Sequence, residues 1–97
     1  MLEKFSMFKI LMVMKQTLGK SASQISRQAN ITYSGGSKTI KEMIEKGMVG
    51  NAKDYEIKLS SDKRGVYLIL TKKGLKLRNL FREVEEILNE NWRRNKR

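Results

Sequence analysis

The stretch of residues 23–49, SQISRQANITYSGGSKTIKEMIEKGMV, constrains the fold of this chain more than any other. Its apolar residues fall into two short runs at helical spacing. The first helix is expected to begin at Ser21–Ser23, whose hydroxyls suit an N-cap, and to end near Asn30. The second is expected to follow Thr32, another capping residue, and to end where Gly47 takes the C′ position. The pattern therefore predicts two short helices joined by a tight turn.

Both predicted helices have an inward apolar face. Gly35 and Gly36 interrupt the second helix, where each glycine costs roughly 1 kcal/mol relative to alanine. We expect Gly36 to leave a gap in the core. The glycine pair has two open explanations, which are close approach of a partner to the helix backbone and relief of crowding against the first helix. The inward residues are expected to be Ile25, Ala29, Ile40, Met43 and Ile44.

Longer helices are predicted at both ends of the chain. One spans residues 2–18 and ends near Gly19. The other opens at Thr71, tolerates Gly74 in its first turn and, if it reaches Arg93, is about 22 residues or roughly 33 Å long. Each has a wider apolar arc than one small core requires, which is typical of a helix buried on two sides. We expect the second side to be a subunit interface formed by Phe5, Phe8, Met12, Leu77, Leu80, Phe81, Val84, Ile87, Leu88 and Trp92.

A β-hairpin is predicted between these helices. Apolar and polar residues alternate on both sides of the polar tip 60–65, SSDKRG. Folding the chain about Asp62 and Lys63 brings the apolar residues of both limbs onto one face, so one register satisfies the core. The expected pairs are Leu59 with Val66, Ile57 with Leu68, and Tyr55 with Leu70.

Composition narrows the function. A chain of 97 residues is expected to form a single domain. Its 21 Lys and Arg against 10 Asp and Glu give a net charge of +11, which favours nucleic acid as a partner, with an acidic membrane surface as the weaker alternative. Cysteine and histidine are absent, which removes disulfides, the commonest general base and the commonest zinc ligand. We therefore expect no catalytic residue, no metal and no cofactor.

The N-terminal segment bears on localisation. Residues 1–20 are rich in apolar side chains, but Lys4, Lys9 and Lys15 interrupt them and no small-residue cleavage site follows. No run in the sequence approaches the roughly 20 apolar residues that span a bilayer. We expect this segment to be a helix of the mature protein and the protein to be cytoplasmic.

The order of the predicted elements, with the segments SQISRQANITYSGGSKTIKEMIEKGMV and YLILTKKG, resembles the winged helix-turn-helix regulators of the MarR type. It is also similar to small archaeal winged-helix DNA-binding proteins that dimerise through a C-terminal helix. The resemblance covers nearly the whole chain. It implies an α+β fold with a three-helix core, a two- to three-stranded β-wing and a long C-terminal dimerisation helix over residues 72–94. The sequence departs from the family at Gly35 and Gly36, where a small polar residue and an aliphatic one are usual.

The resemblance implies three sets of contacts with double-stranded DNA. In this fold the early residues of the third helix face the major groove, and the second helix crosses the backbone. The wing residues Lys63 and Arg64 are expected to add electrostatic contacts, with Arg64 in the minor groove. The major-groove set is Thr32, Tyr33, Ser34, Gly35, Ser37, Lys38 and Lys41, and the backbone set is Ser21, Ser23, Arg27 and Gln28.

Three functions are compatible with these features. The leading hypothesis is a homodimeric, sequence-specific transcriptional regulator that represses by occlusion. The second is a nucleoid-associated architectural protein of low specificity, since the third helix offers short polar residues rather than a set of Arg and Asn readers. The third is a winged-helix module that binds an acidic protein. An enzyme is the least expected, because no nucleophile–base pair can be assembled. The sequence marks no site for a small-molecule effector.

Overall fold

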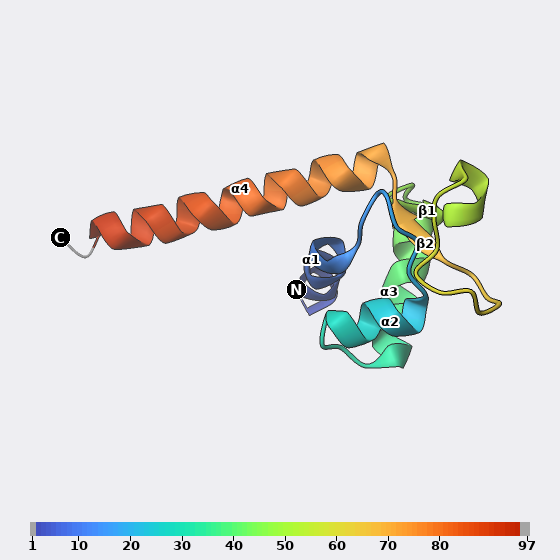
Figure 1. Cartoon of the computed structure of the whole chain (residues 1–97). Coiled ribbons are helices and arrows are strands. Elements are labelled where there is room, and N and C mark those ends of the chain that lie inside the picture. The colour runs from blue at the N-terminus through green and yellow to red at the C-terminus, as the bar shows by residue number, and fades with distance from the viewer. Residues whose placement is uncertain (1, 96–97) are drawn as a thin grey trace.

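The computed structural model describes the backbone of residues 2–95 and the side chains of residues 6–87 and of Asn89. Helices α1, α2 and α3 and a small sheet form a body from which α4 projects (Figure 1), and the molecule measures 54 × 25 × 23 Å. Within residues 2–95, no helix is both long and apolar enough to cross a membrane. The helices are α1 (Leu2–Val13), α2 (Ala22–Gln28), α3 (Tyr33–Glu45) and α4 (Lys72–Asn95), the antiparallel strands are β1 (Val49–Asn51) and β2 (Leu68–Leu70), and the 3₁₀-helix η1 (Ala52–Tyr55) follows β1.

The main core lies where α1, α2, α3 and the sheet meet. Its fully buried side chains come from every one of these elements, and each stabilises the fold by about 1.5–3 kcal/mol relative to an exposed position. Leu77 and Phe81 of α4 pack against the edge of this core. The most deeply buried members are Ile10, Leu11, Met14, Ile25, Met43 and Leu70.

The predicted ends of α2 and α3 are confirmed. The Ser21 hydroxyl oxygen accepts the Gln24 N–H at 3.2 Å, and the Thr32 hydroxyl oxygen accepts the Gly35 N–H at 3.2 Å. Gly47 has φ +78° after the last turn of α3 and donates its N–H to the Ile44 carbonyl at 3.0 Å. These caps satisfy backbone groups that a helix end leaves without partners, which is why local sequence was sufficient to place them.

The first helix is shorter than predicted, since α1 ends at Val13 rather than near Leu18. The chain after Val13 leaves the helix because its backbone bonds to the sheet instead of to itself. The Lys15 carbonyl accepts the Leu70 N–H at 3.0 Å, and Lys20 exchanges backbone hydrogen bonds of 3.0 and 2.8 Å with Leu68. These tertiary bonds replace the ones that another helical turn would have made.

The predicted hairpin register is wrong. Strand β2 pairs with β1, with Val49 opposite Leu70 and Asn51 opposite Leu68. Its other edge is occupied by Lys20, so the segment around Ile57 finds no free edge on β2. Tyr55, the first residue of the predicted outgoing limb, belongs to η1 instead of a strand. Glu56 adopts a left-handed conformation with φ 54°, and Leu59 bridges Gly19 rather than Val66. We call residues 56–67, which connect η1 to β2, the wing.

Two expectations about the inward face of α3 are also corrected. Ile44 is 45% exposed, because it lies about 100° around the helix from buried Met43 and falls at the edge of the packed arc. Gly36 leaves no gap. A Cβ on Gly36 would lie 2.1 Å from the Ser26 hydroxyl oxygen and 3.0 Å from the Ser26 Cβ, so the glycine is what allows α2 and α3 to cross this closely.

The first turn of α4 is attached to the end of α3. The Thr71 hydroxyl donates to the Gly47 carbonyl at 2.6 Å and accepts the Gly74 N–H at 3.2 Å, which confirms the predicted cap. The Lys73 ammonium donates to the Lys46 carbonyl at 2.7 Å. Gly74 is required here and not merely tolerated, because a Cβ at this position would lie 2.1 Å from the Met48 carbonyl oxygen.

Candidate nucleic-acid interface

The N-terminal half of α3 presents an exposed ridge. Of the predicted major-groove residues, Thr32, Tyr33, Ser34, Gly35, Lys38 and Lys41 are exposed, and Ser37 is half-buried. Tyr33 is 60% exposed, so its ring is available to a partner rather than used as packing. The two glycines of this helix have different surroundings. Gly36 faces Ser26 of α2, whereas Gly35 lies on the ridge, where an added Cβ would meet only the Thr32 hydroxyl oxygen, at 3.0 Å.

The predicted backbone-contact residues lie on and around α2. Ser23, Arg27 and Gln28 are exposed, and Ser21 is half-buried at the N-cap. Two of these side chains already have structural partners. The Ser21 oxygen accepts the Gln24 N–H, which leaves its hydroxyl hydrogen free, and the Gln28 Oε1 atom accepts a hydrogen bond from Lys20 at 2.7 Å, which leaves its amide donors free.

The predicted wing residues Lys63 and Arg64 are exposed at the end of the wing, which extends away from α4 (Figure 1). The backbone of Lys63 is held on both sides. Its N–H donates to the Ser61 hydroxyl oxygen at 3.1 Å, and its carbonyl accepts the Tyr67 hydroxyl at 3.0 Å. The root of the wing is attached to α2, because the Ser60 hydroxyl donates to Gln24 Oε1 at 2.8 Å.

Sequence reasoning did not identify Gln24, Ser60 or Tyr67 as part of this surface. Ser60 lies 36 positions from Gln24 in the chain, and no local pattern pairs them. Tyr67 occupies the polar phase of the predicted hairpin, yet it is buried beneath the wing with Ala52 and Ile69. An aromatic residue on the expected outer face is the only hint of this burial in the sequence.

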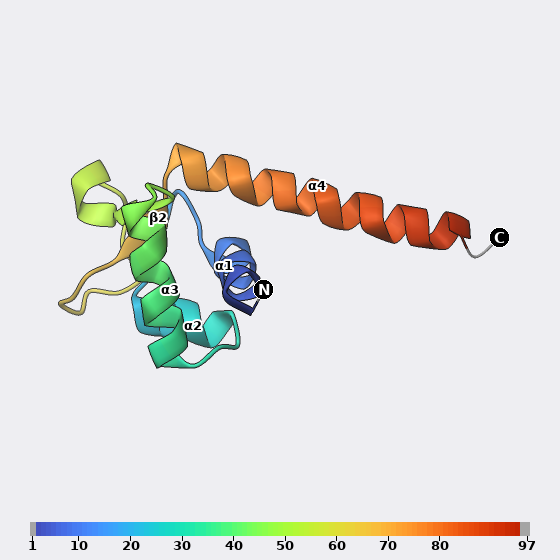
Figure 2. The same cartoon turned by 180° about the vertical axis from the view of Figure 1, so that it is seen from behind.

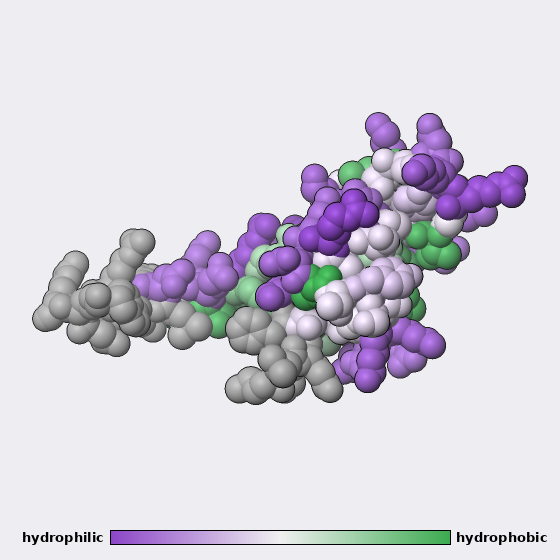
Figure 3. Space-filling model, turned by 90° about the horizontal axis from the view of Figure 1, so that it is seen from below, coloured by the Kyte–Doolittle hydropathy of each residue, from purple (hydrophilic) through white to green (hydrophobic). Residues whose placement is uncertain are grey.

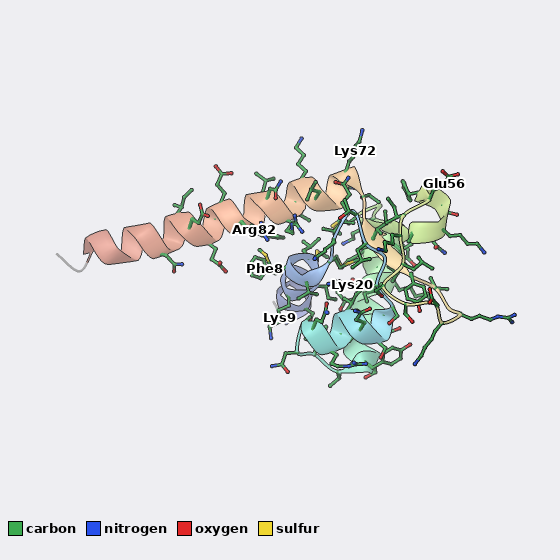
Figure 4. All side chains as sticks on the ribbon, viewed as in Figure 1. Phe8, Lys9, Lys20, Glu56, Lys72 and Arg82 are labelled. Carbon is green, nitrogen blue, oxygen red and sulfur yellow. The ribbon has the colours of Figure 1, made fainter. Side chains whose placement is uncertain are left out.

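Two cationic side chains, those of Lys20 and Arg78, bind the C-terminal end of α1. The Lys20 ammonium donates to the Val13 carbonyl at 2.8 Å as well as to Gln28, and Figure 4 shows it inside the body between α1 and α2. Burial, together with the nearby Lys15 charge, lowers the pKa of Lys20. Arg78 of α4 donates to the Met14 carbonyl at 3.0 Å, and burial together with Arg82 lowers its pKa. Both cations satisfy carbonyls that the end of α1 leaves open, where positive charge is favourable.

The predicted interface residues divide between the body and the surface. Phe8 packs edge-to-face on Phe81, with ring centroids 5.2 Å apart, and Met12 is half-buried. Leu77 also packs against the core. By contrast, Leu80, Val84 and Ile87 of α4 are 50%, 51% and 50% exposed, and green apolar side chains are visible along this helix in Figure 3. The side chains of Phe5, Leu88 and Trp92 lie outside the described residues.

Among the described side chains, no group of three carboxylate, histidine or cysteine residues could hold a metal ion. The surface formed by α2, the α3 ridge and the wing offers hydroxyls, ammonium groups, the guanidinium groups of Arg27 and Arg64, and exposed helix backbone at Gly35. All of these groups are suited to phosphates and base edges.

Comparisons with known proteins agree with this architecture. Residues 5–89 match the sequence family described as winged helix-turn-helix. No curated protein matches the chain. Among solved structures, the chain is similar to the multiple antibiotic-resistance repressor MarR from Listeria monocytogenes 4b F2365, with a TM-score of 0.58 and 17% sequence identity. The alignment covers 88% of this chain and 58% of that one, so this chain spans less than two thirds of the repressor's length. The predicted α+β fold class is confirmed.

Proposed function

The chain belongs to the winged helix-turn-helix family, and from that premise we propose that it is a homodimeric, sequence-specific regulator that binds double-stranded DNA. The observation that carries this proposal is the position of the α3 ridge. In Figures 1 and 2, α2 and the first turn of α3 lie on the side of the body opposite α4, and the wing extends beside them. A single duplex can therefore meet the ridge and the cationic tip of the wing while α4 stays free for a partner.

On this proposal α3 enters the major groove. Lys38 donates to a guanine edge, the hydroxyls of Thr32 and Ser34 bond bases or phosphates, and Tyr33 contacts a thymine methyl or a phosphate. Gly35 lets the helix backbone approach the base edges. Ser21, Ser23, Arg27 and Gln28 contact the phosphates beside the groove, Lys41 lies one turn further along α3, and Lys63 and Arg64 bind the flanking backbone and minor groove.

The second copy of the chain is proposed to cover α4. Leu80, Val84 and Ile87 recur at intervals of four and three residues and form one apolar seam beyond the body. A two-fold pair through this seam presents two α3 ridges to successive major grooves about 34 Å apart, which makes a near-palindromic site the expected target. Occupying such a site in a promoter blocks other proteins, so the proposed action is repression by occlusion.

Duplex selection from random DNA, followed by affinity measurement, tests this function. We expect an enriched half-site, and we expect Lys38→Ala to weaken binding to it by about 1–3 kcal/mol, or roughly tenfold to a hundredfold. The matched control is Lys76→Ala, which removes an equal charge from the exposed face of α4 and should change affinity little. If Lys38→Ala and the pair Lys63→Ala and Arg64→Ala leave duplex binding unchanged, the basic surface serves an acidic protein instead.

Equilibrium sedimentation tests the dimer. We expect a dimer at micromolar concentration and a monomer after Val84→Glu, because the substitution places a charge in the apolar seam without touching the body. The control is Glu83→Gln on the same helix. A wild-type monomer at these concentrations contradicts the dimer.

A second function is favoured by one observation. Helix α3, Tyr33–Glu45, contains no Arg, Asn or Gln, the residues besides Lys that most often read purines in bidentate fashion. A nucleoid-type protein that binds the backbone with little sequence preference needs none of them. The ratio of specific to random-duplex affinity across a salt series separates the two functions, since a ratio below about 10³ favours the architectural one.

A further inference from the structure

The wing lacks the backbone hydrogen bonds between its two limbs that order most β-ribbons. Within the described part of the chain, no β-bridge joins its outgoing limb, residues 56–59, to its returning limb, residues 64–67. The limbs instead border a surface hollow of about 660 Å³, whose lining includes Ile57, Leu59 and Val66. Backbone pairing between the limbs therefore does not hold the wing tip in place.

The outgoing limb is joined instead to Gly19, whose N–H donates to the Lys58 carbonyl at 2.8 Å. Beyond this bridge and the local Ser61–Lys63 turn, two side-chain contacts hold the wing. At the root, the Ser60 hydroxyl donates to Gln24 Oε1 at 2.8 Å, while the Ser60 N–H donates to the Gly19 carbonyl at 2.9 Å. Gln24 belongs to the first turn of α2, and the Ser21 hydroxyl caps its N–H, so this contact joins the wing to the capped N-terminal end of α2.

At the tip, Tyr67 makes the second contact. Tyr67 is 6% exposed and packs with Ala52 of η1 and Ile69 of β2, which set the position of its ring. Its hydroxyl donates to the Lys63 carbonyl at 3.0 Å. A buried phenol anchored in this way fixes the backbone of the residue whose side chain, with that of Arg64, carries the positive charge of the tip.

We propose that Gln24 and Tyr67 are positioning residues, which hold the wing as a preordered arm so that Lys63 and Arg64 meet DNA without first being immobilised. The inference rests on the proposed function, because it concerns how the wing binds a duplex. Preordering raises affinity by removing the entropy that a mobile loop loses on binding. Neither residue needs to touch DNA for this effect.

A double-mutant cycle tests the proposal. The variants are Tyr67→Phe, which removes only the hydroxyl, and Gln24→Met, which keeps the length but removes the acceptor. Each is measured alone and in a background that carries Lys63→Ala and Arg64→Ala. We expect each single substitution to weaken duplex binding by about threefold to tenfold in the wild-type background, and by less than about twofold without the charged tip. Equal losses in both backgrounds would overturn the positioning role.

Matched controls exist in the chain. Tyr55→Phe removes a phenol from an exposed tyrosine of η1, and Gln16→Met makes the same amide change in the segment after α1. Both should bind DNA as the wild type does. If either control lowers affinity as much as its partner variant, the effect belongs to the type of substitution and the inference fails.

A measurement without DNA separates this inference from the proposed function. Amide hydrogen exchange at residues 61–66 should accelerate by about threefold or more in Tyr67→Phe and Gln24→Met, because the opening free energy of the wing falls by one hydrogen bond. Unchanged exchange overturns the ordering argument even if DNA affinity changes. A wild-type protein that binds no duplex refutes the proposed function, whereas a binding protein with an additive cycle refutes only the positioning role.

Discussion

Helix α4 and the wing are both extensions of the same small sheet, but they are attached by different forces. The root of α4 lies so close to the residue before β1 that a methyl group on Gly74 would overlap the Met48 carbonyl oxygen. The wing is held by hydrogen bonds that its side chains donate, from the Ser60 hydroxyl to Gln24 Oε1 and from the Tyr67 hydroxyl to the Lys63 backbone carbonyl. Close packing tolerates no added atom, whereas a single hydrogen bond contributes about 1 kcal/mol and can be lost without unfolding. The difference implies that α4 has a fixed direction and that the order of the wing can be tuned.

Gly74→Ala is expected to have the largest effect. The new Cβ forces the first turn of α4 away from Met48, and we expect a loss of about 3 kcal/mol in the free energy of unfolding. Urea unfolding followed by circular dichroism measures it. The control is Asn79→Ala, an exposed position on α4 where the change should stay within about 0.5 kcal/mol. A Gly74→Ala protein as stable as the wild type would remove one side of the comparison, since close packing would then not fix the root of α4.

Gly36→Ala tests whether the crossing of α2 and α3 is as intolerant of an added atom as the root of α4. The added Cβ meets the Ser26 hydroxyl, which has no hydrogen-bond partner among the described residues, and we expect a loss of about 2 kcal/mol in the free energy of unfolding. The loss should be smaller than at Gly74 because the obstacle is a side chain rather than a backbone carbonyl.

Ser26→Ala supplies the matched variant for this crossing. Alone it should be close to neutral, because it removes a buried hydroxyl that has no partner. Combined with Gly36→Ala it should recover part of the lost free energy, since the nearest atom has been removed. Thermal or urea unfolding of the four proteins gives the coupling energy. Strict additivity would show that the two residues do not meet in solution.

These contrasts explain how far the sequence could predict the structure. The caps at Ser21, Thr32 and Gly47 were predictable because each depends on residues within one helical turn. The early end of α1 was not, because it depends on backbone hydrogen bonds between Lys15 or Lys20 and strand β2, which lies about fifty residues further along the chain. The alternation of residues 55–59 predicted a strand, but β1 and Lys20 already occupy both edges of β2.

The candidate site follows the same division. The ridge residues Thr32, Tyr33 and Lys38 could be predicted from their position in a helix, and they are exposed. Gln24 and Tyr67 could not, because their role consists of contacts with the wing that only the folded chain creates. The helical pattern also could not distinguish Gly36, which faces another helix, from Gly35, which faces solvent.

Lys20 lies between the two cases, and its expected loss is smaller than the losses at Gly74 and Gly36. It is a side-chain link, like those of the wing, but it is 7% exposed and therefore buried, like Gly74 at the root of α4. Lys20→Met removes its bonds to the Val13 carbonyl and to Gln28, and we expect a loss of about 1 kcal/mol in the free energy of unfolding at neutral pH. Urea unfolding of both proteins between pH 7 and pH 10 measures this difference and its pH dependence.

The direction of that pH dependence follows from the pKa of Lys20. Burial lowers this pKa in the folded state below its ordinary value of 10.5, so the unfolded chain binds more protons in the alkaline window between the two values. The buried charge therefore penalises the folded state fully below that window, and the penalty declines as pH rises through it. The wild type should gain stability there relative to Lys20→Met, while the other lysines and the tyrosines titrate in both proteins. If the stability difference between the two proteins narrows with rising pH, the Val13 and Gln28 bonds stabilise the ammonium more than burial destabilises it. Lys20 would then resemble the hydrogen-bonded wing rather than the packed root of α4.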